Sequence, residues 1–186
     1  MGMTDELVAA GPWPGHEREM NLYGRLVGTW DVVNRYYVED RQEWVTGTVV
    51  WTFGWALAGH TVQDVMWFTA PGPDGYPRRV TGSTVRHYDP ASKTWAIVWF
   101  SPLGSVTSLT GRAADDGGIT QEGTQADGRR IRWEFTDVTG DSFRWRGYTS
   151  SAEGDKSAEA DEADKGTERD KGESWRLEQE MLARRR

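Results

Sequence analysis

The feature that most constrains this chain is a succession of about ten short segments in which apolar and polar residues alternate, separated by very brief turns. Alternation with a period of two is typical of a strand with one buried face. The links are rich in Asp, Gly and Pro, as at 89–92, 116–118 and 127–128, and such short links join antiparallel neighbours. The candidate strands cover roughly residues 28–38, 42–53, 60–69, 80–88, 94–101, 105–112, 118–125, 129–136, 142–150 and 173–182.

About ten antiparallel strands in sequence, with hardly any helix, favour a closed up-and-down barrel over a sandwich. Closure also removes the edges that such aromatic strands would otherwise expose. The sequence therefore predicts an all-β fold, a single up-and-down antiparallel β-barrel of about 8–10 strands. A short amphipathic helix is expected between His16 and Leu26, on the spacing of Met20 and Tyr23.

The chain has 186 residues, a length that predicts one domain. Residues 1–15, punctuated by Gly and Pro, predict an irregular N-terminal arm, residues 16–182 the barrel domain, and residues 183–186 a basic tail. Residues 151–172 break the pattern, because they contain eight acidic and four basic residues but no aromatic residue and no Val, Ile or Leu. This composition predicts a mobile acidic insertion before the last strand.

Charge and cysteine content exclude several classes of function. The chain has 22 Lys and Arg against 29 Asp and Glu, which argues against a nucleic-acid binder. It has no cysteine, so disulfides, thiolate metal sites and cysteine nucleophiles are excluded. No run approaches the roughly 20 apolar residues of a membrane span. The first twenty residues also lack the apolar core of a signal peptide, so we expect a cytoplasmic protein.

Eleven tryptophans, six tyrosines and five phenylalanines are the most unusual part of the composition. They can fill a β-rich core, or they can line a cavity for a hydrophobic or aromatic small molecule. A barrel interior can serve both purposes. The strand at 94–101 is apolar on both faces, so we expect the arm or a second copy in a homodimer to cover its outer side. The residues expected to bind a ligand in the lumen are Trp30, Asn34, Trp51, Met66, Phe68, Tyr88, Trp133 and Trp145.

Three stretches resemble known barrels. Gly28-Thr29-Trp30 follows the expected helix, and it is joined by the stretches 87–95 and 131–145. Together they resemble a bacterial calycin-like, or lipocalin-like, family of unknown function over most of residues 20–182. The resemblance implies a barrel whose base is plugged by the helix, with Trp30 packed inward over it. It also implies an Arg near the end of the last strand that packs on this Trp, for which Arg176 and Arg184 are the candidates.

A small polar set falls on the inward faces of the predicted strands. A carboxylate in a barrel lumen is costly unless paired, so Asp64 should find Arg86 or a tyrosine hydroxyl. One interpretation is a satisfied internal network. The other is a catalytic set, in which Asp64 is the base or anchor, Arg86 clamps an anion or carbonyl, and Tyr36 donates a hydrogen bond. A shift of one residue in that strand would place His87 inward in place of Arg86.

The three histidines, His16, His60 and His87, show no spacing typical of a metal site. His60 or His87 could still be an axial ligand if the barrel bound haem. The sequence contains no phosphate loop and no dinucleotide motif, so we expect no cofactor. Three hypotheses follow: a carrier or sensor that holds a hydrophobic small molecule, a cofactor-independent cyclase or isomerase acting on a polyketide- or terpenoid-like substrate, and a haem-binding barrel.

Overall fold

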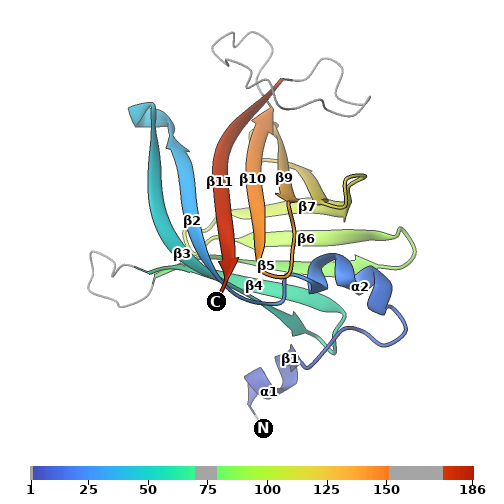
Figure 1. Ribbon diagram of the computed structural model, residues 1–186. Coiled ribbons are helices and arrows are strands. Elements are labelled where there is room, and N and C mark those ends of the chain that lie inside the picture. The colour runs from blue at the N-terminus through green and yellow to red at the C-terminus, as the bar shows by residue number, and fades with distance from the viewer. Residues whose placement is uncertain (1, 70–78, 151–173) are drawn as a thin grey trace.

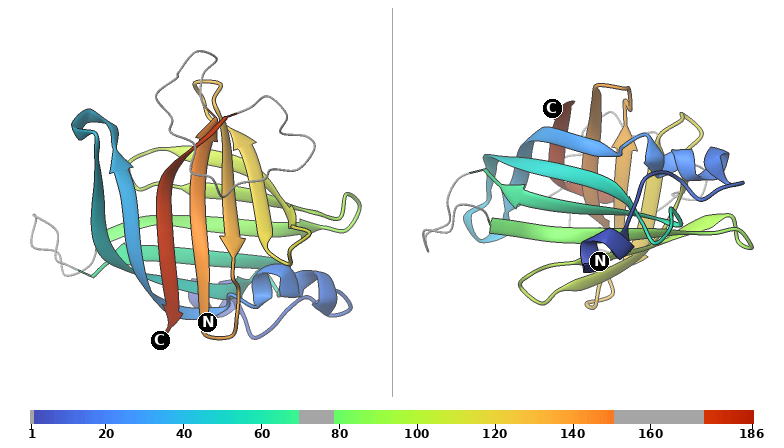
Figure 2. Two further views of the ribbon diagram at one scale, coloured as in Figure 1. Left: turned by 45° about the horizontal axis from the view of Figure 1, so that its top comes forward. Right: turned by 90° about the horizontal axis from the view of Figure 1, so that it is seen from below.

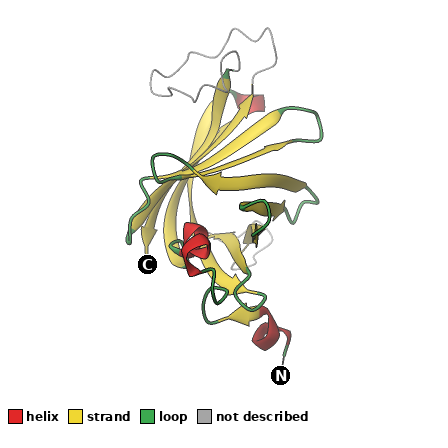
Figure 3. Ribbon diagram, turned by 90° about the vertical axis from the view of Figure 1, so that its right-hand side faces the viewer, coloured by secondary structure: helices red, strands yellow, loops and turns green. Residues whose placement is uncertain are grey.

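The computed structural model describes residues 2–69, 79–150 and 174–186. Helix is confined to three short elements of this part of the chain (Figure 3). The elements are α1 (Met3–Leu7), β1 (Val8–Ala9), α2 (Glu17–Gly24), β2 (Gly28–Val38), η1 (Glu39–Arg41), β3 (Glu43–Ala56), β4 (Thr61–Phe68), β5 (Arg79–Asp89), β6 (Thr94–Phe100), β7 (Val106–Ala113), β8 (Ile119–Thr124), β9 (Arg130–Thr136), β10 (Ser142–Ser150) and β11 (Trp175–Arg185).

Strands β2 to β11 form one closed antiparallel barrel (Figure 1). Each strand pairs with its neighbour in sequence, and β11 pairs with β2 to complete the circle. The ten strands lie close to the ten expected segments, and the predicted fold class is confirmed. The closed ladder satisfies the backbone groups that an open sheet would leave at its edges.

The alternation of side chains holds around the barrel. Trp30 pairs with Trp51, and both are buried inside. Asp31, the next residue, is exposed on the outer surface. Because side chains alternate along a strand, one correct position fixes the face of every residue in the same unbulged strand.

Helix α2 closes the end of the barrel where β10 begins and β11 ends (Figure 2). Its Met20 and Tyr23, with Leu26 just after it, are fully buried. The edge of the Tyr23 ring meets Trp95, with ring centroids 4.7 Å apart. Trp30 Nε1 donates a hydrogen bond of 2.7 Å to the backbone carbonyl of Leu26. We call this closed end the base, and the helix that the sequence predicted is what fills it.

An arginine does pack on the opening tryptophan, but it is Arg185. Its guanidinium carbon lies 4.1 Å from the centroid of the Trp30 ring, and its nitrogens donate to the carbonyls of Val27 and Gly140. The two predicted candidates were wrong. Arg184 occupies the preceding position of the strand and is exposed. Arg176 lies at the far end of β11, where it forms ion pairs with Glu178 and Glu39.

Gly28 is required by this arrangement. Its φ of 135° favours glycine, and a Cβ atom at this position would collide with Nη1 of Arg185. The glycine of the Gly-x-Trp motif therefore makes room for the arginine that covers the tryptophan.

The ends of the chain are more regular than expected. The arm contains α1 and β1, and β1 pairs with the end of β3 at Trp55 and Ala56. Residues 183–185, expected in a basic tail, belong to β11. The predicted acidic insertion at 151–172 lies outside the described residues. No helix in the described ranges is long and apolar enough to cross a membrane.

The arm does not cover the outer side of β6. It pairs with β3 instead, and Phe100 on the outer side of β6 remains 45% exposed. The prediction of a cover from the arm is therefore wrong. A homodimer through this face stays a prediction.

Candidate ligand-binding cavity

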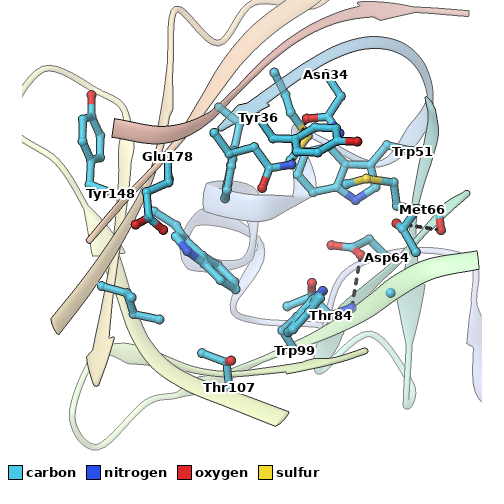
Figure 4. Close-up of a pocket in the computed structure, with 18 of the residues that line it drawn as sticks. Asn34, Tyr36, Trp51, Asp64, Met66, Thr84, Trp99, Thr107, Tyr148 and Glu178 are labelled. Atoms are coloured by element: carbon cyan, nitrogen blue, oxygen red, sulfur yellow. Dashed lines mark hydrogen bonds between the residues drawn. The ribbon is translucent and has the colours of Figure 1, made fainter. Parts of the chain in front are cut away.

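The end of the barrel opposite α2 contains a cavity of about 490 Å³. Strands β2 to β7 and β9 to β11 contribute to it (Figure 4). Aromatic and thioether side chains make up much of the wall, and polar groups are placed between them. The apolar part of the wall is formed by Trp51, Met66, Phe68, Trp99, Ile131, Trp133, Trp145 and Met181.

Nine of the eleven residues predicted for the site line this cavity, so the structure brings most of the set together. They are Asn34, Tyr36, Trp51, Asp64, Met66, Phe68, Arg86, Trp133 and Trp145. Trp30 and Tyr88 do not line it. Trp30 is fully buried at the base, and Tyr88 packs near Trp95 at the same end. The alternation of side chains along each strand predicted which face each residue occupies, but it carried no information about how deep in the barrel the residue lies.

Trp99 was missed as a site residue, although the alternation along β6 places it on the inner face with Trp95. Its ring meets Trp133 edge-on at 6.3 Å, and Trp133 lies 5.7 Å from Trp145. Two glycines make room for these rings. A Cβ at Gly82 would lie 2.5 Å from Nε1 of Trp99, and one at Gly147 would lie 2.7 Å from the Trp145 ring. The cluster of Trp99, Trp133 and Trp145 therefore depends on small residues facing it.

Asp64 and Arg86 form a buried ion pair at the cavity wall. Arg86 Nη1 donates to Asp64 Oδ2 at 2.5 Å, and both side chains are only 2% exposed. The backbone N–H of Thr84 donates to the other carboxylate oxygen at 3.1 Å (Figure 4). Of the two partners predicted for Asp64, Arg86 or a tyrosine hydroxyl, the structure shows Arg86, and Arg86, not His87, points inward. Phe53 and Tyr23 lie beside the guanidinium, so apolar rings surround the pair away from the cavity.

Tyr36 lies apart from this pair. It lines the cavity on β2, where it is paired with Gln179 of β11. Among the interactions of the described residues, none joins Tyr36 to Asp64 or Arg86. On the same two strands, Nε2 of Gln179 donates a hydrogen bond of 2.8 Å to Oδ1 of Asn34. The three residues predicted as a catalytic set therefore share a cavity but do not form one hydrogen-bonded constellation.

Two of the three histidines pack against Trp13 of the arm. His60 stacks on its ring and His16 meets it at a tilt, each with its ring centroid 4.0 Å from that of Trp13. His87 is exposed on the outer face of β5 and makes a hydrogen bond with Thr61. Neither His60 nor His87 lines the cavity, so the haem hypothesis loses both of its predicted axial ligands. In the described part of the chain, no group of three metal-ligating side chains is assembled.

Several buried polar groups have no partner among the described residues. Nε1 of Trp51 and Nε of Arg86 belong to residues that line the cavity, whereas the hydroxyl of Tyr23 and the side-chain amide of Gln121 belong to residues that do not. An unpaired buried donor or acceptor costs about 1–3 kcal/mol. Burial raises the pKa of Tyr23 above its ordinary value, although the positive charge of Arg86 opposes that shift. The wall of the cavity next to the base therefore contains unmet hydrogen-bonding capacity.

No protein-family model and no curated protein sequence matches this chain. Solved structures do match it. One of them, an S-type phycobiliprotein lyase from Guillardia theta, superposes with a TM-score of 0.56 over 92% of this chain and 97% of that chain, at 10% sequence identity. A likeness at this identity shows the fold, a lipocalin-like barrel, and it agrees with the fold that Gly28-Thr29-Trp30 implied.

Proposed function

We propose that this protein binds a hydrophobic, aromatic small molecule in the open end of its barrel, as a carrier or sensor. The observation that carries the proposal is the cavity of about 490 Å³ walled by tryptophan rings. Pockets for small molecules are concave and mostly apolar, with a few polar groups that orient the ligand. The phycobiliprotein lyase that this chain resembles in fold is consistent with the proposal, because its name indicates that a barrel of this fold can act on a small-molecule pigment.

The first experiment is native mass spectrometry of freshly purified protein, followed by solvent extraction of whatever is released. A bound species at defined stoichiometry is the expected result. In parallel, the neutral fluorophore N-phenyl-1-naphthylamine tests the cavity directly. Trp133→Ala should weaken its binding about tenfold, because the wall of the cavity loses a ring.

Trp44→Phe is the matched control, since Trp44 packs under Arg35 and does not line the cavity. We expect it to leave the affinity for the fluorophore unchanged. Equal loss of binding in both variants, or none in either, would place the fluorophore elsewhere and contradict the proposed site.

The alternative proposal is a cofactor-independent cyclase or isomerase that uses the same cavity. The Asp64–Arg86 pair favours it, because a carboxylate and a guanidinium at the wall of an apolar cavity could bias charge in a bound substrate. Asp64 is already engaged by Arg86 and by Thr84, so a role as a base requires the substrate to displace one of these contacts.

Asp64→Asn separates the two proposals once a candidate substrate is known. A carrier should retain its affinity, whereas an acid–base enzyme should lose turnover while binding persists. Turnover that survives this substitution would remove Asp64 from any proton-transfer role.

A further inference from the structure

Two N–H donors beside the cavity lack an acceptor. They are Nε1 of Trp51 and Nε of Arg86, both fully shielded from solvent and both without a partner among the described residues. The two residues also line the cavity. Figure 4 shows the indole nitrogen of Trp51 turned toward the side of the cavity where Asp64 lies. Buried donors are nearly always paired, so this pattern indicates that an acceptor arrives from outside the chain.

The acceptors nearby are already in use. The two oxygens of Asp64 accept from Arg86 and from the backbone of Thr84, and Oδ1 of Asn34 accepts from Gln179. Among the residues that line the cavity, the unpaired buried groups are therefore donors, because Gln121, whose amide oxygen is also unpaired, does not line it. A ligand that brings another donor would not satisfy them, whereas a ligand oxygen with free lone pairs would.

The charges at the cavity wall determine what kind of oxygen fits. Asp64 and Arg86 neutralise each other, and the remaining charged residue of the wall is Glu178. Figure 4 shows Glu178 on the opposite side of the cavity from Asp64. Glu178 is itself paired with Arg176, at 2.8 Å, so an anionic ligand would find no uncompensated positive charge at this wall. Burying an unpaired anion is costly, and a neutral acceptor avoids that cost.

We propose that the ligand carries a neutral carbonyl oxygen of the ketone type, which accepts hydrogen bonds from Trp51 and Arg86. Its apolar body then lies among Trp99, Trp133 and Trp145 toward the open end. This inference rests on the proposed function of ligand binding in the cavity and names the chemistry of the ligand. A site that pairs its donors with a ligand oxygen discriminates strongly against an analogue that lacks the oxygen.

The test compares two probes of nearly the same shape, 2-acetylnaphthalene and 2-ethylnaphthalene, which differ by a carbonyl in place of a methylene. Equilibrium binding by quenching of tryptophan fluorescence gives the ratio of their affinities. We expect the wild-type protein to prefer the ketone by about tenfold or more. Trp51→Phe should reduce that preference to about twofold, because the ring remains but the donor is lost.

Trp145→Phe is the matched control, since Trp145 lines the cavity and its indole nitrogen is not among the unpaired buried groups. It should weaken both probes and leave their ratio unchanged. The affinity for 2-ethylnaphthalene also reports whether each variant is folded. A ratio near one in the wild-type protein would overturn the inference and leave the proposed function standing.

Two other outcomes are decisive. Binding of neither probe would contradict the proposed function and the inference with it. Binding of 2-naphthoate more tightly than the ketone would overturn the neutral character of the ligand, because the cavity would then favour an anion.

Discussion

The two ends of this barrel are built from the same strands, yet one is packed and the other is hollow. Strand β6 shows the contrast within four residues. Trp95 and Trp99 share its inner face, but Trp95 is buried against Tyr23 at the base, whereas Trp99 borders the cavity. The residue type and the face are the same at both positions. What differs is the element that packs against each ring, because α2 fills the base and no described element fills the opposite end.

The difference teaches that tryptophan content does not decide between core and pocket. A ring becomes core where a second layer covers it, and it becomes a wall where the barrel remains open. The polar pair of Asp64 and Arg86 lies between the two environments, since Arg86 contacts both Tyr23 of the base and the cavity.

The largest expected effect comes from removing one tryptophan at each end. Trp30→Ala should lower the free energy of unfolding by about 4 kcal/mol, because it empties a fully enclosed site. Trp133→Ala should cost about 1–2 kcal/mol, since its ring already borders the cavity and loses fewer contacts. Urea denaturation of both variants measures the difference. Equal losses would mean that the two ends are packed alike.

The next effect concerns the ion pair between the two regions. Arg86→Met should cost about 3 kcal/mol or more, because it leaves the Asp64 carboxylate buried without its counterion. The double substitution Asp64→Leu with Arg86→Met should recover most of that loss, since it leaves no buried charge. Denaturation curves of the single and double variants test this. A double variant as unstable as the single one would show that packing, and not the unpaired charge, sets the cost.

A smaller effect is expected at the outer surface of the base. Arg185→Ala should cost about 1–2 kcal/mol, because it removes the stack on Trp30 and the hydrogen bonds to the carbonyls of Val27 and Gly140. Arg184→Ala, one position away on the exposed side, should change stability by less than about 0.5 kcal/mol. Thermal unfolding of the two variants checks which arginine covers the tryptophan.

The smallest effect is expected at Tyr23. Its hydroxyl is buried without a partner, so Tyr23→Phe should leave stability within about 1 kcal/mol of wild type. Burial raises the pKa of Tyr23 in the folded protein. Above a pH of about 10 the unfolded tyrosine loses its proton while the folded one keeps it, so stability falls as pH rises.

The wild-type protein should therefore lose more stability than Tyr23→Phe between a pH of about 9 and about 11. Tyr36→Phe, at the open end, serves as the control for the loss of a tyrosine hydroxyl. Urea midpoints across this range provide the measurement, and parallel losses in wild type and Tyr23→Phe would contradict the role of burial.

Most of the barrel was predictable from the sequence. Alternation and turn residues located ten strands, and β2 begins and ends at the expected residues, 28 and 38. The inward face of β2 was also predictable, because a period of two leaves only one choice once Trp30 is placed inside. The cost of burying a lone carboxylate predicted that Asp64 would have a partner, either Arg86 or a tyrosine hydroxyl, and the structure selects Arg86.

Most of the errors have one origin. Trp30 and Tyr88 were expected at the ligand, and Arg176 on Trp30, because the sequence pattern carries no coordinate along the barrel axis. Arg184 was also expected on Trp30, although it lies on the outer face of its strand. Arg185 shares the face of Met181 and is paired with Trp30 across the β11–β2 ladder. Parity was enough to exclude Arg184. Only the register of two strands far apart in the sequence could select Arg185.

The sequence by itself determined that this chain forms an all-β barrel and which side chains face its interior, because local alternation and turn chemistry act within a few residues. Only the tertiary structure decided which of those interior residues form the core and which form the cavity. That choice depends on where α2 lies and on how each strand is staggered against the next, and both are set by contacts between residues distant in the chain.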